Sequence, residues 1–118
     1  MKINRNILLV ALLLSALSLS AQSNAKLLRR GNRQYRKGNY EKAEATYQRI
    51  LAETPNQAKA QFNLGDAYYA QENYDGAFKA FQKVLDMTPD VKLKSNAVYN
   101  MGNCLLAQQK YYDAFNIY

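Results

Sequence analysis

Apolar and polar residues follow a helical period over most of this chain. Between Tyr74 and Leu85, apolar residues recur at spacings of three and one, which places them on one broad helix face. The residues of that face are Tyr74, Ala77, Phe78, Phe81, Val84 and Leu85. The same kind of pattern predicts helices near 26–37, 40–53, 58–71, 74–87 and 95–108, with a sixth that starts near 111.

Turn-forming residues separate the predicted helices. Pro55 and Pro89 end the second helix of each pair, because proline lacks the N–H that would continue it. Asn39 and Asn73 stand where the next helix begins, and asparagine is a favourable N-cap. Gly38 can take the left-handed conformation that ends the preceding helix.

The helices recur as copies of one unit. Five matching pairs lie 34 residues apart, and a third copy follows at a distance of 37. The pairs are Gly31 and Gly65, Tyr40 and Tyr74, Ala43 and Ala77, Tyr47 and Phe81, and Pro55 and Pro89; the third copy has Gly102, Tyr111, Ala114 and Tyr118. The three extra residues fall within Val91–Lys94, where they would lengthen a helix start by almost one turn.

This repetition predicts an all-α superhelix of about two and a half to three helix pairs. The repeats are expected at 26–57, 58–91 and 92–118, and the last is incomplete. Its apolar residues Val98, Met101 and Leu105 lack a full cover, whereas a helical solenoid normally closes with a polar capping helix. We therefore expect this sequence to be a piece of a longer protein.

The N-terminal segment 1–25 is typical of a secretory signal peptide. Lys2 and Arg5 give it a positive start, and the apolar run Ile7–Leu19 has 13 residues, fewer than the ~20 that span a bilayer. Small residues follow, so cleavage after Ser20, Ala21 or Ala25 is sterically reasonable. The alternative is an uncleaved membrane anchor. Export to the periplasm or cell envelope is the expectation, and it disfavours binding of cytosolic nucleic acid.

Charge and composition narrow the chemistry. The net charge is +7, and Lys26–Lys37 holds six basic residues with no acid. Such a segment suits an acidic protein partner, nucleic acid or anionic lipid, or is simply a solvated helix face. The sequence has no histidine, so His-based catalysis is excluded, and its one cysteine, Cys104, is expected to fill a packing position. We expect no enzyme activity, cofactor, metal or small-molecule substrate.

The second copy carries a family resemblance. Leu64-Gly65-x-x-Tyr68, then Ala77-x-x-x-Phe81, then Pro89 resembles the tetratricopeptide repeat (TPR) pattern, and the likeness extends over about residues 24–118. The chain departs from that pattern at Gln61, where the family often has Trp. The resemblance implies a TPR solenoid that binds a protein or peptide in its concave groove.

The same resemblance implies which residues line that groove. They come from the first helix of each pair: Arg29, Asn32, Tyr35 and Arg36; Lys59, Phe62, Asn63, Asp66 and Tyr69; and Asn96, Tyr99, Asn100, Asn103 and Leu106. Such a basic, amide-rich and aromatic surface suits an extended or helical peptide, including an acidic one. The alternative is that Asn32, Asn63 and Asn103 only hold local geometry.

A narrower resemblance concerns two short stretches. Arg30-Gly31-Asn32 with Tyr35, Gly38 and Tyr40, and Tyr99-Asn100-Met101-Gly102-Asn103, look like exported TPR proteins of bacterial aerotolerance (Bat-type) operons. That likeness implies a periplasmic scaffold for membrane proteins with von Willebrand A-type domains. Two alternatives stay open: a non-catalytic subunit of a cell-wall or outer-membrane assembly complex, and the N-terminal part of a longer enzyme.

Overall fold

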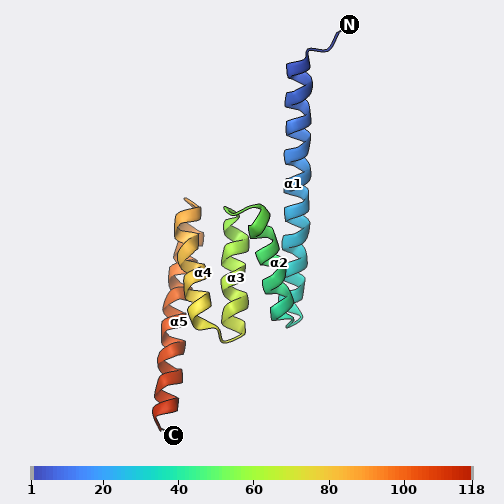
Figure 1. Ribbon diagram of the computed structural model, residues 1–118. Coiled ribbons are helices and arrows are strands. Elements are labelled where there is room, and N and C mark those ends of the chain that lie inside the picture. Colours follow the sequence, from blue (N-terminus) through green and yellow to red (C-terminus); the bar gives the residue numbers. More distant parts are fainter. Residues whose placement is uncertain (1, 118) are drawn as a thin grey trace.

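The computed structural model describes residues 2–117, without the side chains of residue 20 and residues 113–117. The described part is built from helices that follow one another in space as they do in the sequence (Figure 1). They are α1 (Arg5–Arg36), α2 (Tyr40–Glu53), α3 (Ala58–Ala70), α4 (Tyr74–Met87) and α5 (Val91–Ile117). Each packs on its neighbour in the chain, so the predicted all-α superhelix of stacked helix pairs is confirmed.

The turns between paired helices follow the sequence prediction. Gly38 has a φ of 80° and ends α1, as predicted, and Glu72 takes the equivalent left-handed position after α3 with a φ of 61°. The Asn73 side chain accepts a hydrogen bond from the Gly76 N–H and so caps α4. Asn39 precedes α2 in the same way, but its side chain makes no capping bond. Helices α2 and α4 end two residues before Pro55 and Pro89, as predicted.

Two clusters of buried side chains hold the stack together. The first contains Ala43, Tyr47 and Ile50 of α2 and Leu64 of α3, and Leu27 and Leu28 of α1 pack against it. The second joins α3, α4 and α5 through Ala77, Phe81, Val84, Ala97 and Cys104, and Tyr74, Phe78 and Leu85 pack against it. The apolar face predicted for α4 is therefore its core face. Cys104 is fully buried, which confirms its packing role.

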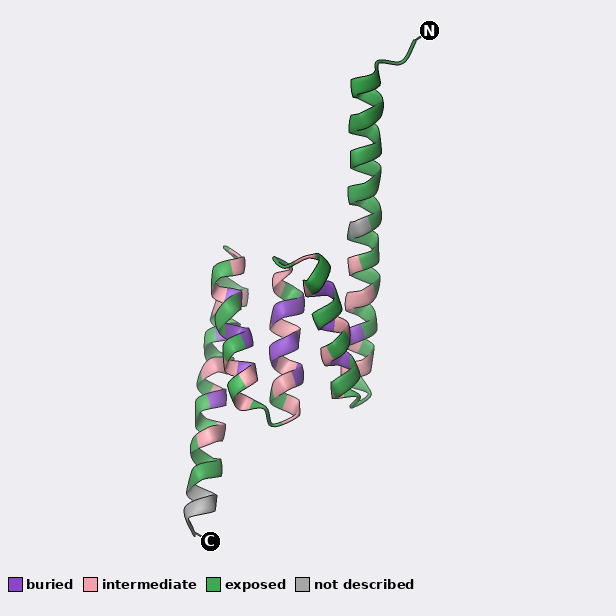
Figure 2. Cartoon of the chain, in the orientation of Figure 1, coloured by how far each residue is buried: buried purple, intermediate pink, exposed green. Residues whose placement is uncertain are grey.

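Helix α1 is longer than the repeat requires. A helix was expected only near 26–37, but α1 runs without a break from Arg5, because residues 5–30 contain neither proline nor glycine. Its leucine-rich first half projects from the repeats and is exposed (Figure 2). Within the described chain, only α1 is long and apolar enough to cross a membrane, and N-terminal signal sequences meet the same criteria.

Helix α5 also differs from the expectation of two helices, 95–108 and one from about 111. It is continuous to Ile117. Gln109 and Lys110 stand where the other copies have a left-handed residue followed by asparagine, so neither a helix stop nor an N-cap interrupts it. Its start at Val91, where the Asp90 carboxylate accepts from the N–H groups of Lys92 and Leu93, confirms that the three extra residues lengthen this helix.

The outer face of α5 has no helix packed over it among the described residues. Val98 and Leu105 are each 54% exposed, in line with the predicted lack of a full cover, whereas Met101 packs partly against the second cluster. The positions Ala114 and Tyr118, which match the core residues Ala77 and Phe81, lie outside the side chains that the structure describes.

Candidate functional site

A small cavity of about 200 Å³ opens between the first helices of the two complete pairs. Helix α1 contributes Asn32, Tyr35 and Arg36, α3 contributes Asn63 and Asp66, and Tyr47 of α2 completes the lining. Gly31, one position before Asn32, lets the Tyr47 ring lie against α1 and bring its hydroxyl to this wall. We call this cavity the α1–α3 pocket.

Two asparagines join the helices across the α1–α3 pocket. Asn32 Oδ1 accepts a hydrogen bond of 2.7 Å from the Tyr47 hydroxyl and one of 2.9 Å from Asn63 Nδ2. One amide oxygen thus connects α1 to both α2 and α3. These bonds favour the interpretation that Asn32 and Asn63 hold local geometry, and they also fix the polar atoms that face the pocket.

Asp66 is the electrostatic feature of the pocket. Its carboxylate has no hydrogen-bond or ion-pair partner within the described part of the chain. Burial raises the pKa of Asp66 to about 6, because a partly desolvated carboxylate is costly. Burial and then the nearby Asp66 charge also raise the pKa of Tyr35, and they raise that of Tyr47 to about 12.

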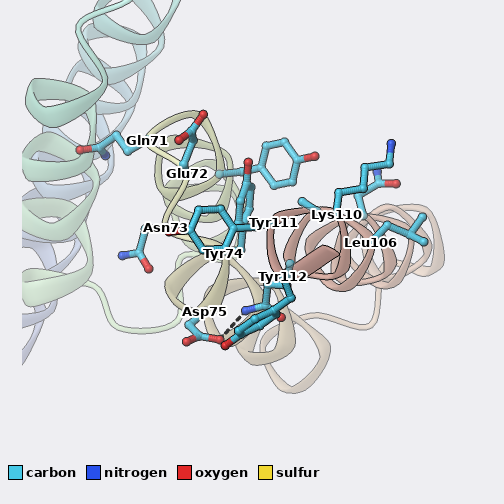
Figure 3. Close-up of a pocket in the computed structure, with 13 residues that line it drawn as sticks. Gln71, Glu72, Asn73, Tyr74, Asp75, Leu106, Lys110, Tyr111 and Tyr112 are labelled. Carbon is cyan, nitrogen blue, oxygen red and sulfur yellow. Dashed lines mark hydrogen bonds between the residues drawn. The ribbon is translucent and has the colours of Figure 1, made fainter. Parts of the chain in front are cut away.

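A second, wider depression lies between the α3–α4 turn and the end of α5 (Figure 3). It measures about 910 Å³ and includes Tyr69, Glu72, Tyr74, Asn103 and Leu106 in its lining. Gln108 donates a hydrogen bond to the Asp75 carboxylate at its edge, and Tyr69 and Tyr74 pack edge to face. This surface is broad and open, so it offers an area for contact and no enclosed site.

The predicted groove residues are therefore divided between different environments. Asn32, Tyr35, Arg36, Asn63 and Asp66 meet in the α1–α3 pocket, whereas Tyr69, Asn103 and Leu106 line the wider depression. Phe62 packs edge to face on Phe81 and belongs partly to the core. The other five predicted groove residues line neither hollow, and all of them but Asn100 are exposed. They are Arg29, Lys59, Asn96, Tyr99 and Asn100.

The prediction missed the contribution of the second helices. Tyr47 is not among the predicted groove residues, and its column recurs as Phe81 in the next copy. The difference between the two copies was the available signal: a hydroxyl on a ring that is otherwise fully buried must find a hydrogen-bond partner. Tyr74 and Asp75 of α4 line the wider depression and were missed because the predicted groove drew only on the first helix of each pair.

The chemistry of both hollows is that of binding. They present amides, phenols, the carboxylates of Asp66, Glu72 and Asp75, and the cationic groups of Arg36 and Lys110. No group of three potential metal-ligating side chains occurs among the residues that the structure describes. The one thiol of the chain lies inside the second cluster.

Comparison with protein families identifies the repeat. The profile of the tetratricopeptide repeat matches residues 28–92, more than half of the chain and the stretch from the core-packed end of α1 to the start of α5. The chain belongs to the tetratricopeptide repeat family. TPR domains generally mediate protein–protein interaction and are typically non-catalytic scaffolds. Comparison with individually curated proteins gave no significant match.

Proposed function

We propose that this TPR chain is an exported scaffold of the bacterial envelope, which holds a partner protein or peptide along the groove formed by α1 and α3. The observation that carries the proposal is the convergence of five groove residues, from two successive first helices, on one pocket. Such a surface binds by shape and hydrogen bonding, and a rigid stack of helices concentrates or orients its partner.

The N-terminal segment supports the proposed location. The first half of α1 is apolar, exposed and makes no part of either buried cluster, which suits a segment with a role in export. The periplasm or cell envelope is accordingly the proposed site of action.

The positive charges at the rim of the groove are the evidence for an acidic stretch in the partner. Arg29 and Arg36 are exposed on α1, and Lys59 is exposed at the start of α3. Rim charges of one sign speed the association of an oppositely charged partner and make it sensitive to salt. Membrane proteins with von Willebrand A-type domains, implied by the narrower resemblance to Bat-type proteins, stay a prediction for the partner's identity.

The proposal is tested by capture in the cell. The full chain is expressed in envelope-bearing bacteria, crosslinked in place and purified with whatever it holds. The double variant Arg29→Glu and Arg36→Glu should recover at least about tenfold less of the principal partner, because each change removes an attraction and adds a repulsion. Lys79→Glu, an exposed charge change on α4, is the matched control and should recover the wild-type amount.

The opposite result of the capture experiment would reject the groove assignment. If the double variant captures the partner normally while Lys79→Glu loses it, the partner binds the second helices and the groove assignment is wrong. Unchanged helical circular dichroism in both variants ensures that a loss reports binding, since both arginines are exposed in the structure.

A further inference from the structure

The α1–α3 pocket combines a basic rim with an interior rich in acceptors. Arg36 is an exposed residue of its lining, which also includes the partly buried Asp66 and the oxygen-bearing side chains of Tyr35, Tyr47 and Asn63. Asn32 Oδ1 is already occupied by two donors. The carboxylate therefore faces the pocket without a donor of its own in the described chain.

We propose that the α1–α3 pocket is a subsite for a single cationic side chain, a lysine or arginine of the bound peptide, whose charged group pairs with Asp66. This inference rests on the proposed function and specifies its partner: a peptide that carries one basic residue next to the acidic stretch that meets the rim. The subsite reverses the charge preference expected from the basic α1 segment alone.

The size of the pocket fits one side chain. At about 200 Å³ it is smaller than the ~300–1,000 Å³ of sites that enclose a drug-sized ligand. Its walls include the half-buried Tyr35 ring, which suits both the aliphatic stem of lysine or arginine and the cation itself. Tyr47 contributes its hydroxyl, since its ring is buried in the first cluster. A glutamate of the partner would instead place a second carboxylate beside Asp66.

The charged and titratable groups around Asp66 are few. Arg36 and Tyr35 face it from α1, Tyr47 from α2, and the buried Cys104 thiol lies near it on α5. Of these only Arg36 is charged near neutral pH. Arg36 is exposed and forms no ion pair with Asp66 in the structure, so the carboxylate is free to accept an incoming cation.

Capped tripeptides test the subsite directly. The full chain, labelled with ¹⁵N and kept soluble in an uncharged detergent, is titrated with acetyl-Gly-Arg-Gly-amide, acetyl-Gly-Gln-Gly-amide or acetyl-Gly-Glu-Gly-amide. The caps remove the terminal charges, so only the central side chain differs. The arginine peptide should shift the amide signals of residues near 32 and 63–66 in a saturable way, and the other two should bind at least about tenfold more weakly.

Variants and pH identify the group that is responsible. Asp66→Asn should weaken the arginine peptide about tenfold, whereas Asp86→Asn, at an exposed position on α4, should leave it unchanged. Arg36→Gln should bind it at least as tightly as wild type, because a like charge is removed. Binding should strengthen from pH 5 to pH 7 in wild type, as Asp66 ionises, but not in Asp66→Asn.

Three results would overturn the subsite. They are equal binding of the glutamate and arginine peptides, full arginine binding by Asp66→Asn, and shifts confined to residues outside the pocket. None of these affects the capture experiment with the Arg29 and Arg36 variants, so failure of the subsite and failure of the groove function are distinguishable. If the arginine peptide binds the subsite but the partner is captured elsewhere, only the groove function is rejected.

Discussion

The ring of Phe81 lies directly on the backbone of Gly65. A Cβ atom added to Gly65 would lie 2.6 Å from Phe81 Cε1, far inside van der Waals contact. Gly31 and Tyr47 repeat this relationship in the preceding copy, again at 2.6 Å. The absence of a side chain at each glycine is thus what allows the two helices of a pair to approach each other.

The first prediction concerns this contact. Gly65→Ala should destabilise the protein by about 1–2 kcal/mol, because overpacking a rigid buried ring costs ~1–3 kcal/mol and the better helix propensity of alanine returns less than ~1. Phe81 is only 1% exposed and cannot move aside. Gly31→Ala should behave in the same way, and urea unfolding measures both.

The third copy supplies the control. A Cβ atom on Gly102 would meet no atom within 4 Å among those that the structure describes, which do not include the side chain of Tyr118. Gly102→Ala should therefore raise stability by up to about 1 kcal/mol, through helix propensity alone. Equal losses at positions 65 and 102 would show that the ring contact is not the cause.

The left-handed turns give a second prediction. Glu72 holds a φ of 61°, which costs a residue with a Cβ atom roughly 1–2 kcal/mol, whereas Gly38 fills the equivalent place in the first copy. Glu72→Gly should stabilise the protein by about 0.5–1 kcal/mol once the greater freedom of unfolded glycine is counted. A drop in the urea midpoint would contradict the assigned conformation.

The reciprocal change tests the same turn from the other side. A Cβ atom at Gly38 would have no neighbour within 4 Å among the described atoms, so Gly38→Ala introduces backbone strain without a steric clash there. It should cost about 1 kcal/mol. The two substitutions should therefore shift the unfolding midpoint in opposite directions.

The third prediction follows from the pKa of Asp66. Burial raises this pKa from 3.8 to about 6, so folding favours the protonated carboxyl group. Its contribution to stability is most favourable below pH 3.8 and is lost as the pH rises through about 6. At pH 7–8, Asp66→Asn should be more stable than wild type by on the order of 1–3 kcal/mol.

The same measurement at low pH provides the check. Near pH 3.5 the Asp66 carboxyl is largely protonated in both states, so the advantage of Asp66→Asn should shrink toward zero. The other carboxylates are the same in wild type and variant, so their effects cancel in the difference between the two free energies of unfolding. A difference that does not change between pH 3.5 and pH 8 would show that Asp66 is solvated and its pKa ordinary.

The period of the sequence predicted the helix pairs because it records contacts that recur. Gly31 and Gly65 repeat since each has a ring placed against it, and Ala43 and Ala77 repeat since each is fully buried. The end of the third copy was not predictable in this way: its glycine and tyrosines matched, but Gln109 and Lys110 carry neither a stop nor a cap, and local helix propensity prevails.

The α1–α3 pocket was predictable only in part. The family resemblance implied the groove residues of α1 and α3, and helical spacing agrees with one shared face for Asn32 and Arg36. It did not reveal that Asn32 accepts from Tyr47 and Asn63, since this depends on how three helices stack. Nor did it show that Asp66 lacks a partner, because the sequence does not tell which side chains of the neighbouring helices surround a single acidic residue of α3.

The predicted signal peptide overlaps the first contacts of the repeat domain. Asn24, which the sequence assigned to the signal peptide, donates a hydrogen bond of 2.8 Å from Nδ2 to the Thr54 hydroxyl at the end of α2. Leu27 and Leu28 then pack against the first buried cluster. The contacts of the repeat domain thus begin at Asn24 within α1.

We therefore expect signal cleavage after Ser20 or Ala21, and not after Ala25. Cleavage after Ala25 would remove Asn24 and leave the Thr54 hydroxyl without that donor, at a cost of about 0.5–1.5 kcal/mol. Mass spectrometry of the protein from the cell envelope should show an N-terminus at Ala21 or Gln22. An intact Met1 would indicate an uncleaved anchor, and an N-terminus at Lys26 would show that the Asn24 bond does not influence the site. Asn24→Ala should lower the unfolding midpoint of a processed protein that begins at Ala21 or Gln22, and should not affect one that begins at Lys26.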